Sequence, residues 1–395
     1  QGFGLRIERK DEPYFPVITR TAGPDFSDIN NYTSNQYDVL IQSGWDNSRG
    51  ASIDFKKLFS TPVPSYIKAG YRWRTKKRDT IRETFRMFYV GPDGVMGLNR
   101  ATGINDDNLA QFIDPGYTSP GTRLSRYPNV PRPMIPGRDT EGSTYGKTGF
   151  NVETALKANP PLFAPDVVFN TLQPLIGETH FKESVFAPYF MGSVDIGRVN
   201  VMGGVRVETT EVWGNGPLQT LTAAEIARRA AYVGPVTTAQ GVPAIPGSIE
   251  ESRRRVLAER SGRQTAQGEY RKVFPGLHFK YQPRPNIVTR LSYATNIGRP
   301  SIGQLIPTTT INLPGVNDSV GSISTSNPSL KPQIANNFDL SGEYYFEPAG
   351  VVSVGLFLKE IKDFSYTRAG DTVGSGPNNG FEGQYEGYLL TSQQN

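Results

Sequence analysis

Apolar and polar side chains alternate along residues 336–364, on both sides of a sharp turn. Every second residue is apolar in "FDLSGEYYF", and the alternation resumes in "GVVSVGLFLKEIKDF" after Pro348. A period of two predicts β-strands, and Pro-Ala-Gly between two such runs predicts a hairpin. One face of the predicted pair carries Val352, Val354, Leu356 and Leu358, and the other carries Asp339, Glu343 and Lys359.

The same hairpin unit recurs along the chain. Strands predicted at 52–59 and 66–74, 183–191 and 198–210, and 270–281 and 287–296 are joined by short turns rich in Pro and Gly. Arg206 and Arg290 occupy positions opposite the apolar series of their own strands. Charged side chains therefore gather on one face of every pair.

The connections between these hairpins are much longer than the turns within them. They span 77–179, 211–268 and 298–332, whereas most loops of compact domains have about 4–6 residues. Inside the second connection, Thr222 with Glu225 and Ser248 with Glu251 have the spacing of helix capping boxes. Short turns at one end and long loops at the other are typical of a transmembrane β-barrel, whose lipid face alternates with its lumen face.

Composition excludes several alternatives. No apolar run reaches the roughly 18 residues of a spanning helix, and 36% hydrophobic residues with a mean hydropathy of −0.43 suit either a soluble β-protein or a β-barrel. There is no cysteine and only two histidines, so we expect no disulfide, no metal site and no cofactor. The net charge of +5 is too mild to indicate nucleic acid. The basic run at 71–86 is expected at the outer rim, facing lipopolysaccharide phosphates.

Three stretches resemble the barrel of TonB-dependent outer-membrane receptors. They are "ESVFAPYFMGSVDIGRVNVMGGVRVETT", "FPGLHFKYQPRPNIVTRLSYATNIGRP" and "NPSLKPQIANNFDLSGEYYFEPAGVVSVGLFLKEIKDF", in that order along the chain. The resemblance implies an all-β fold, an antiparallel transmembrane β-barrel segment of about ten strands from a larger 22-stranded barrel with long extracellular loops. Residues 1–395 are then expected to be a barrel segment incomplete at both ends, without the family's plug domain or TonB box.

The resemblance also implies a function. Family members reside in the cell outer membrane of Gram-negative bacteria, contact its lipid and lipopolysaccharide, and import a scarce ligand when the TonB complex acts through the plug. An iron–siderophore and an oligosaccharide are the main candidates for that ligand. The residues themselves leave open a secreted all-β carbohydrate-binding module or enzyme, and a passive porin. No pattern of carboxylates indicates a catalytic site, so we expect no enzyme.

Side-chain roles follow from the alternation. The series Val352, Val354, Leu356 and Leu358 is expected to face lipid, while the lumen would receive Arg206, Arg290, Asp339, Glu343 and Lys359. Trp213, just after the strand 198–210, and Arg299, just after the strand 287–296, are the expected ligand-binding residues. An indole offers a stacking platform, and a guanidinium binds anions through two hydrogen bonds.

Overall fold

The computed structural model describes residues 4–8, 17–24, 31, 35–99, 101–107, 158–236, 247–314, 320–381 and 383–395. These residues belong to two compact units. The first unit consists of Gln1–Ile41, Glu83–Pro174 and Ala224–Ala258, and the second of Gln42–Arg82, Leu175–Ala223 and Glu259–Asn395.

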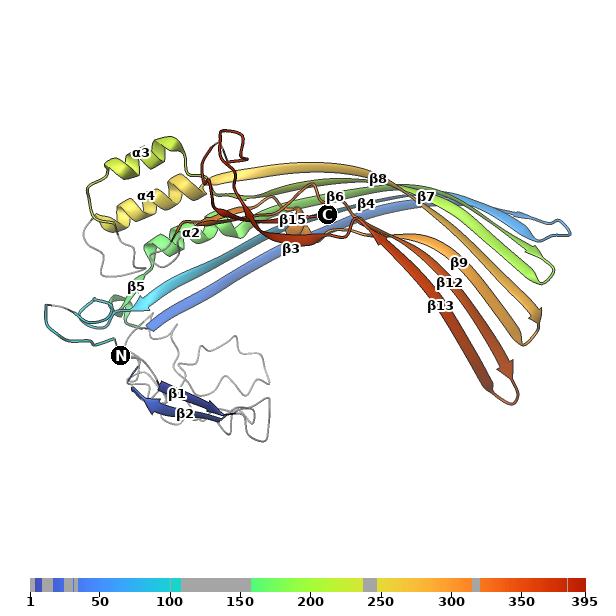
Figure 1. Cartoon of the computed structure of the whole chain (residues 1–395), viewed down its shortest axis with the longest axis horizontal. Helices are drawn as coiled ribbons and strands as arrows, with labels where there is room; N and C mark the ends of the chain where they lie inside the picture. Colours follow the sequence, from blue (N-terminus) through green and yellow to red (C-terminus); the bar gives the residue numbers. More distant parts are fainter. Residues whose placement is uncertain are drawn as a thin grey trace. The chain divides into compact units, whose positions relative to one another are not determined.

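A sheet of long antiparallel strands makes up most of the second unit (Figure 1). Its neighbours run in the order β13, β12, β9, β8, β7, β6, β4 and β3. The all-β fold expected from the alternation is therefore confirmed. The strands are β3 (Asn35–Phe59), β4 (Ser65–Tyr89), β6 (Glu178–Ile196), β7 (Val199–Leu218), β8 (Gly262–Arg284), β9 (Ile287–Gly298), β12 (Gln333–Phe346) and β13 (Gly350–Lys362).

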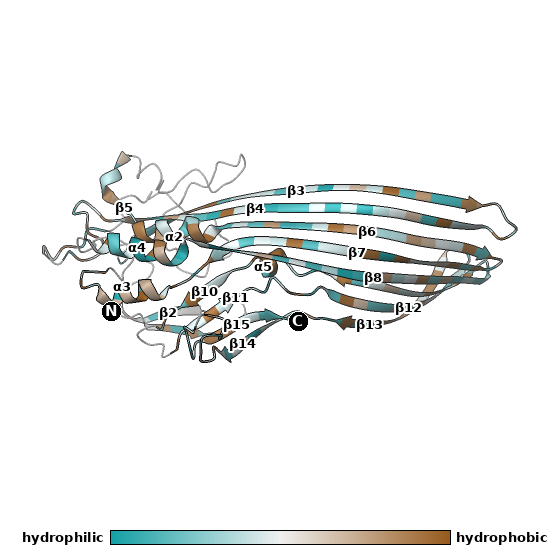
Figure 2. Cartoon of the chain, turned by 90° about the horizontal axis from the view of Figure 1, so that it is seen from above, coloured by the Kyte–Doolittle hydropathy of each residue, from teal (hydrophilic) through white to brown (hydrophobic). Residues whose placement is uncertain are grey.

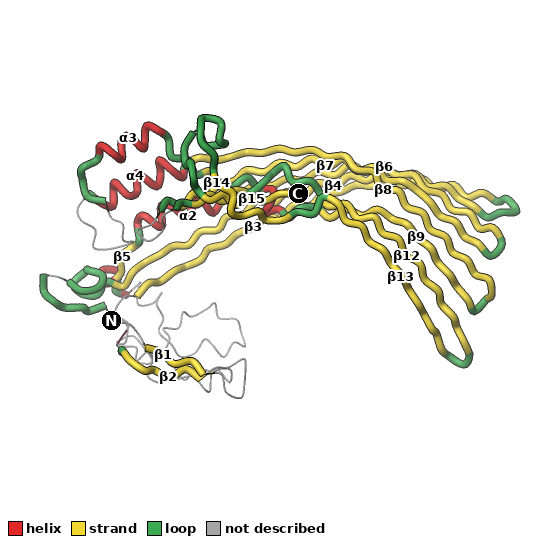
Figure 3. The backbone as a smooth tube through the Cα atoms, in the orientation of Figure 1, coloured by secondary structure: helices red, strands yellow, loops and turns green. Residues whose placement is uncertain are grey.

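Short turns join these strands in pairs at one end of the sheet (Figure 3). They lie at 60–64, 197–198, 285–286 and 347–349, between the hairpin strands that the sequence predicts. Gly197 has a φ of 60° in one of the two shortest turns, a conformation that glycine adopts without the strain of a Cβ atom. Sequence alternation and turn chemistry thus give the correct strand neighbours within each pair.

Several strands are longer than the alternation indicates. β4 continues to Tyr89 and β7 to Leu218, while β8 begins at Gly262. Residues 77–89, 211–218 and 262–268 are therefore strand, although the sequence places them in long loops. Beyond the apolar stretch both faces of these strands carry polar side chains, so the period of two disappears while the backbone pairing continues.

Register gives the sheet two chemically distinct faces. Phe338 pairs with Leu358 and Asp339 with Phe357, so the even-numbered residues of β12 and β13 share one side. The side defined by Val352, Val354, Leu356 and Leu358 is called the apolar face here. It continues through the following residues of the neighbouring strands: Phe338, Leu340, Leu291, Tyr293, Leu277, Phe279, Val201, Val205, Phe190, Val194, Ile67 and Tyr71.

No layer of described protein covers the apolar face. Val354 is 63% exposed and Leu356 is 66% exposed, far above the values of core residues. The opposite side, called the polar face, carries Arg206, Arg290, Asp339, Glu343 and Lys359 by the same register. Figure 2 shows hydrophilic and hydrophobic segments along the long strands of this sheet.

The connection after β9 folds against the polar face. It contains α5 (Ile302–Leu305), β10 (Thr309–Asn312) and β11 (Ser322–Thr325). Leu305 and Ile306 form a buried cluster with Leu330 of the same connection. Phe181 and Val212 of the sheet belong to the same cluster, and the partly buried Tyr270 packs against it. A second cluster joins Ile311, Ile323 and Val373 close to β14 (Tyr366–Thr372) and β15 (Leu389–Gln394).

The first unit contains short elements of its own. β1 (Gly4–Glu8) pairs with β2 (Val17–Ala22), and β5 (Phe163–Pro165) pairs with the end of β4. The 3-10 helix η4 (Pro160–Leu162) precedes β5, and α2 (Val167–Gly177) follows it. Among the described residues, no helix is both long enough and apolar enough to span a membrane.

Two helices form where the capping boxes predict them. They are α3 (Ala223–Ala231) and α4 (Ser248–Arg260). The Arg228 guanidinium joins them, with contacts of 2.6 Å to Glu225 and 2.9 Å to Glu251. Hydrogen bonds from Arg228 and Arg229 lower the pKa of Glu225 to about 2. That carboxylate therefore stays ionised, and the ion pairs persist, at any ordinary pH.

Glycine allows the connection to lie close to β7, which gives a first prediction. A Cβ atom on Gly216 would lie 2.3 Å from the Pro307 carbonyl oxygen, whereas one on Gly355 would meet nothing within 4 Å. Gly216→Ala should cost about 1–3 kcal/mol of stability by overpacking, and Gly355→Ala should be neutral. Thermal unfolding of the protein measures both, and equal midpoints would contradict this packing.

Candidate ligand-binding site

Arginine side chains from two strands and one connection surround a hollow on the polar face. Its volume is about 440 Å³. Arg72 and Arg74 come from β4, Arg206 from β7 and Arg299 from the residues after β9. Val185 and Ala187, both buried, form its floor. We call this site the arginine hollow.

Two carboxylates hold the arginine hollow together. Glu208 accepts hydrogen bonds from Arg206 at 2.7 Å and from Arg299 at 2.5 Å. Glu183 lies 3.4 Å from Arg74 and 3.7 Å from Arg299. Three guanidinium groups, those of Arg74, Arg206 and Arg299, therefore share two carboxylates, and Arg72 adds a fourth positive charge to the hollow. The hollow therefore has a positive excess. The planar guanidinium fork matches carboxylate, phosphate and similar anions.

Arg299, expected to bind ligand, is thus one of the residues that form the arginine hollow. No local motif groups it with Arg72, Arg74, Glu183 and Glu208, which belong to the same site. The sequence carries one clue: Arg72 and Arg74 alternate with aromatic residues in "YRWR", which places both arginines on the same face of a strand. Only the register between β4, β6 and β7 brings these positions together.

Trp213 lies elsewhere. It belongs to β7, pairs with Lys182 and Gln267, and has the register of the apolar face, whereas the partners of Arg299 lie on the polar face. Its surroundings form a separate hollow of about 700 Å³ that also includes Glu211 and Glu269. The two expected ligand-binding residues therefore do not form one site, and the role of each stays a prediction.

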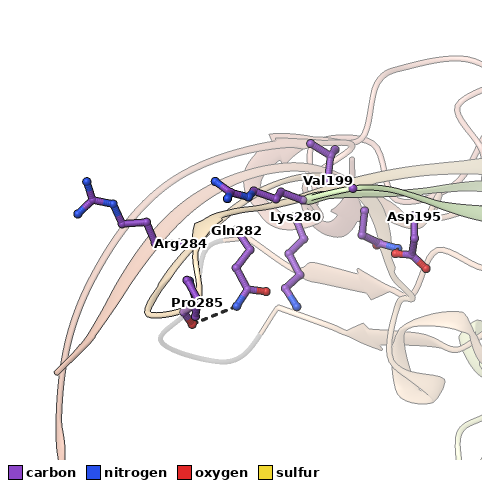
Figure 4. A pocket seen from close by; sticks show the side chains of 9 residues that line it. Asp195, Val199, Lys280, Gln282, Arg284 and Pro285 are labelled. Atoms are coloured by element: carbon purple, nitrogen blue, oxygen red, sulfur yellow. Dashed lines mark hydrogen bonds between the residues drawn. The ribbon is translucent and has the colours of Figure 1, made fainter. Parts of the chain in front are cut away.

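A smaller hollow lies beside the short turns (Figure 4). Its volume is about 350 Å³, and its walls include Asp195, Lys280 and Arg284. Gln282 donates a hydrogen bond of 3.1 Å to the Pro285 carbonyl oxygen and closes the turn between β8 and β9. This hydrogen bond stabilises the turn.

Histidine and acidic residues give no metal centre in the described ranges. No group of three or more His, Asp or Glu side chains there could hold an ion. His180 lies between two carboxylates, 2.7 Å from Asp79 and 3.2 Å from Glu178. The contact with Asp79 connects β6 with β4, whereas Glu178 belongs to the same strand as His180.

The shared carboxylate of the arginine hollow gives a second prediction. Only 9% of the Glu208 side chain is exposed, so Arg299→Ala leaves a nearly buried charge with one partner fewer. The loss should be about 1–3 kcal/mol or more, and Glu208→Gln should partly offset it in the double variant. A double-mutant cycle of chemical unfolding measures this coupling; strictly additive effects would contradict it.

Comparison with known proteins identifies the family. The model of the family "TonB dependent receptor-like, beta-barrel" matches residues 3–395. No curated protein is significantly similar in sequence. Among solved structures, the closed form of the ferric-catecholate import receptor Fiu from K12 E. coli is 12% identical with a TM-score of 0.38, over 88% of this chain and 34% of that one.

The hemophore receptor HasR of Serratia marcescens, a double mutant in complex with its hemophore HasA and heme, is 10% identical with a TM-score of 0.33. That match covers 92% of this chain and 47% of HasR. The chain therefore spans about a third to a half of the length of these two receptors. Because the family model matches nearly every residue, the chain belongs to the TonB-dependent receptor β-barrel family.

Proposed function

We propose that this chain is the membrane-embedded part of an outer-membrane receptor that imports a scarce ligand with energy from the TonB complex. The bare apolar face on a sheet of the TonB-dependent receptor family carries this proposal. A soluble protein rarely leaves so large an apolar surface uncovered. Lipid is the surrounding medium that such a surface fits.

The dimensions of the apolar face support a place in a bilayer. On β7 its apolar side chains run from Val199 to Val207, and a tilted membrane strand needs about 9–11 residues. Each inner strand of the sheet pairs on both sides, so its backbone donors and acceptors are satisfied without water. Val352, Val354, Leu356 and Leu358 would then contact lipid, in a Gram-negative outer membrane.

The polar face would line the lumen in the same arrangement. Arg206, Arg290, Asp339, Glu343 and Lys359 would contact water, ligand or a plug domain through which the TonB complex acts. The positive excess of the arginine hollow suits the anionic groups of an iron–siderophore, and the long connections suit either a siderophore or an oligosaccharide. Lipopolysaccharide would surround the outer rim.

The two faces give a third prediction. Leu356→Arg places a charge on the apolar face and should destabilise the full-length receptor by about 2–4 kcal/mol if that residue lies near the bilayer midplane. Phe357→Arg, on the polar face and 83% exposed, should cost much less. Chemical unfolding in lipid vesicles compares the two variants. Equal losses would show that protein, not lipid, covers the apolar face.

Uptake tests the function as a whole. The full-length receptor should require detergent for extraction, should migrate faster on SDS gels when unboiled, and should support ligand-dependent growth only in cells with an intact TonB complex. Arg299→Ala and Trp213→Ala, at matched surface expression, test the two expected ligand-binding residues. Recovery as a soluble periplasmic monomer, or uptake that persists without TonB, would refute the proposal.

A further inference from the structure

Three cationic side chains lie together where short turns join β6 to β7 and β8 to β9. They are Arg198, Lys280 and Arg284, and they line the hollow of about 350 Å³ drawn in Figure 4. Asp195 is the one acid among the residues that line it, and it accepts a hydrogen bond of 2.6 Å from Asn200. This site, called the turn hollow here, therefore has a positive excess. It shares no residue with the arginine hollow.

Backbone contacts between the two turns fix the position of Arg198. Its guanidinium donates a hydrogen bond to the carbonyl oxygen of Pro283, the residue before Arg284. The Gln282 amide in turn donates to the Arg198 carbonyl oxygen at 2.9 Å. In the described part of the chain no acid forms an ion pair with Arg198 or Arg284. The charges of both arginines are therefore available to a partner outside the protein.

The two arginines stand at the edge of the apolar face. Arg198 directly precedes Val199, where the apolar side chains of β7 begin. Arg284 follows Tyr281 by three residues, at most about 10 Å along the chain. The headgroup layer on each side of the hydrocarbon is about 5–8 Å thick. With the apolar face in lipid, as proposed above, both guanidinium groups stand at the depth of headgroup phosphates.

Aromatic side chains mark the same level of the sheet. Tyr281 pairs with Val199, and Tyr344 pairs with Ile287 at the start of β9. Tyr344 also stacks on Phe346, with ring centroids 5.9 Å apart. Tyrosine gathers at membrane–water interfaces, because its ring prefers hydrocarbon and its hydroxyl prefers water. The aromatic side chains therefore place the interface at the short-turn end independently of the arginines.

The direction of Arg284 suits a ligand at the rim of the sheet. Figure 4 shows Arg284 extending away from Lys280 and Gln282. A guanidinium binds a phosphate through two parallel hydrogen bonds, and Arg198 keeps further N–H groups after its bond to Pro283. We propose that Arg198 and Arg284 bind the phosphate of an anionic phospholipid. That lipid lies in the leaflet at the short-turn end, which is the periplasmic leaflet in barrels of this kind.

The charge of the turn hollow selects an anionic over a zwitterionic phospholipid. An ethanolamine or choline headgroup carries its own cation next to the phosphate, and that cation would meet the positive excess of the site. Phosphatidylglycerol presents the same phosphate without a cation. An arginine close to an anionic lipid surface strengthens binding about fivefold.

The proposal rests on the proposed function, because it requires the apolar face to lie in a bilayer. Native mass spectrometry of the protein purified in detergent tests it, by measuring the dissociation constants of added lipids. The probes are dioleoyl-phosphatidylglycerol and dioleoyl-phosphatidylcholine, whose acyl chains are identical. We expect phosphatidylglycerol to bind about 25-fold more tightly, since two arginines contribute about fivefold each.

Variants of the two arginines should change this preference. Arg198→Gln and Arg284→Gln should each weaken phosphatidylglycerol binding about fivefold and leave phosphatidylcholine binding unchanged. Arg284→Lys keeps the charge and should lose much less than Arg284→Gln. Arg368→Gln removes an exposed arginine of β14 outside the turn hollow, so this matched control should bind both lipids as the unmodified protein does.

Arg284→Gln decides the matter even if Arg198→Gln, which loses the contact with Pro283, does not fold. The Arg284 side chain makes no hydrogen bond in the described part of the chain, so its replacement leaves the turn intact.

Three results would overturn the proposal. The two lipids could bind alike, or the glutamine variants could keep the full preference for phosphatidylglycerol. Inorganic phosphate, compared with chloride at the same ionic strength, could also displace the phosphatidylglycerol, which would assign the arginines to a soluble anion. Detergent extraction and TonB-dependent growth test the proposed function separately. A receptor that meets both criteria but does not distinguish the two lipids would refute this lipid site alone.

Discussion

Hydrogen bonding between neighbouring strands is the constraint on which the rest of this structure depends. Each inner strand of the sheet satisfies its backbone through the strands on either side, and the pairing fixes the register residue by residue. Because side chains alternate, one register decides the face of every residue at once, and a slip by one residue would exchange the two faces. The uncovered apolar face and the charged polar face are consequences of this pairing.

Strands are predictable from the sequence where their two faces differ in polarity. Around Phe338 and Leu356 an apolar residue alternates with a polar one, and Pro-Gly turns mark the ends, so strands and hairpins could be predicted. The predicted strand ends are wrong where the strands continue past the apolar stretch, as in residues 77–89 of β4. Polar residues there occupy both faces, and only the neighbouring strand reveals that the backbone is still extended.

The candidate site was harder to predict for a related reason. Arg299 was identified from its place at the end of a strand, but Arg74, Glu183 and Glu208 come from strands far apart in the sequence. No local motif connects such residues, since a sheet brings them together only through cumulative register. Trp213 was placed just after a strand expected to end at residue 210, so the sequence did not determine which face its side chain occupies. Because β7 continues past that residue, the register places Trp213 on the side of the apolar face.

The length of β7 would also set the geometry of the proposed import. At about 3.3 Å per residue, Leu218 lies roughly 36 Å along the strand from Val207, where the apolar side chains stop. The end of β7 would then stand well outside a bilayer that enclosed the apolar face, and the arginine hollow close to its edge. A ligand captured at the far end would have to descend a wall of polar side chains in separate steps. Arrival and translocation would then be separate kinetic events, with their own rates and their own sensitivity to mutation.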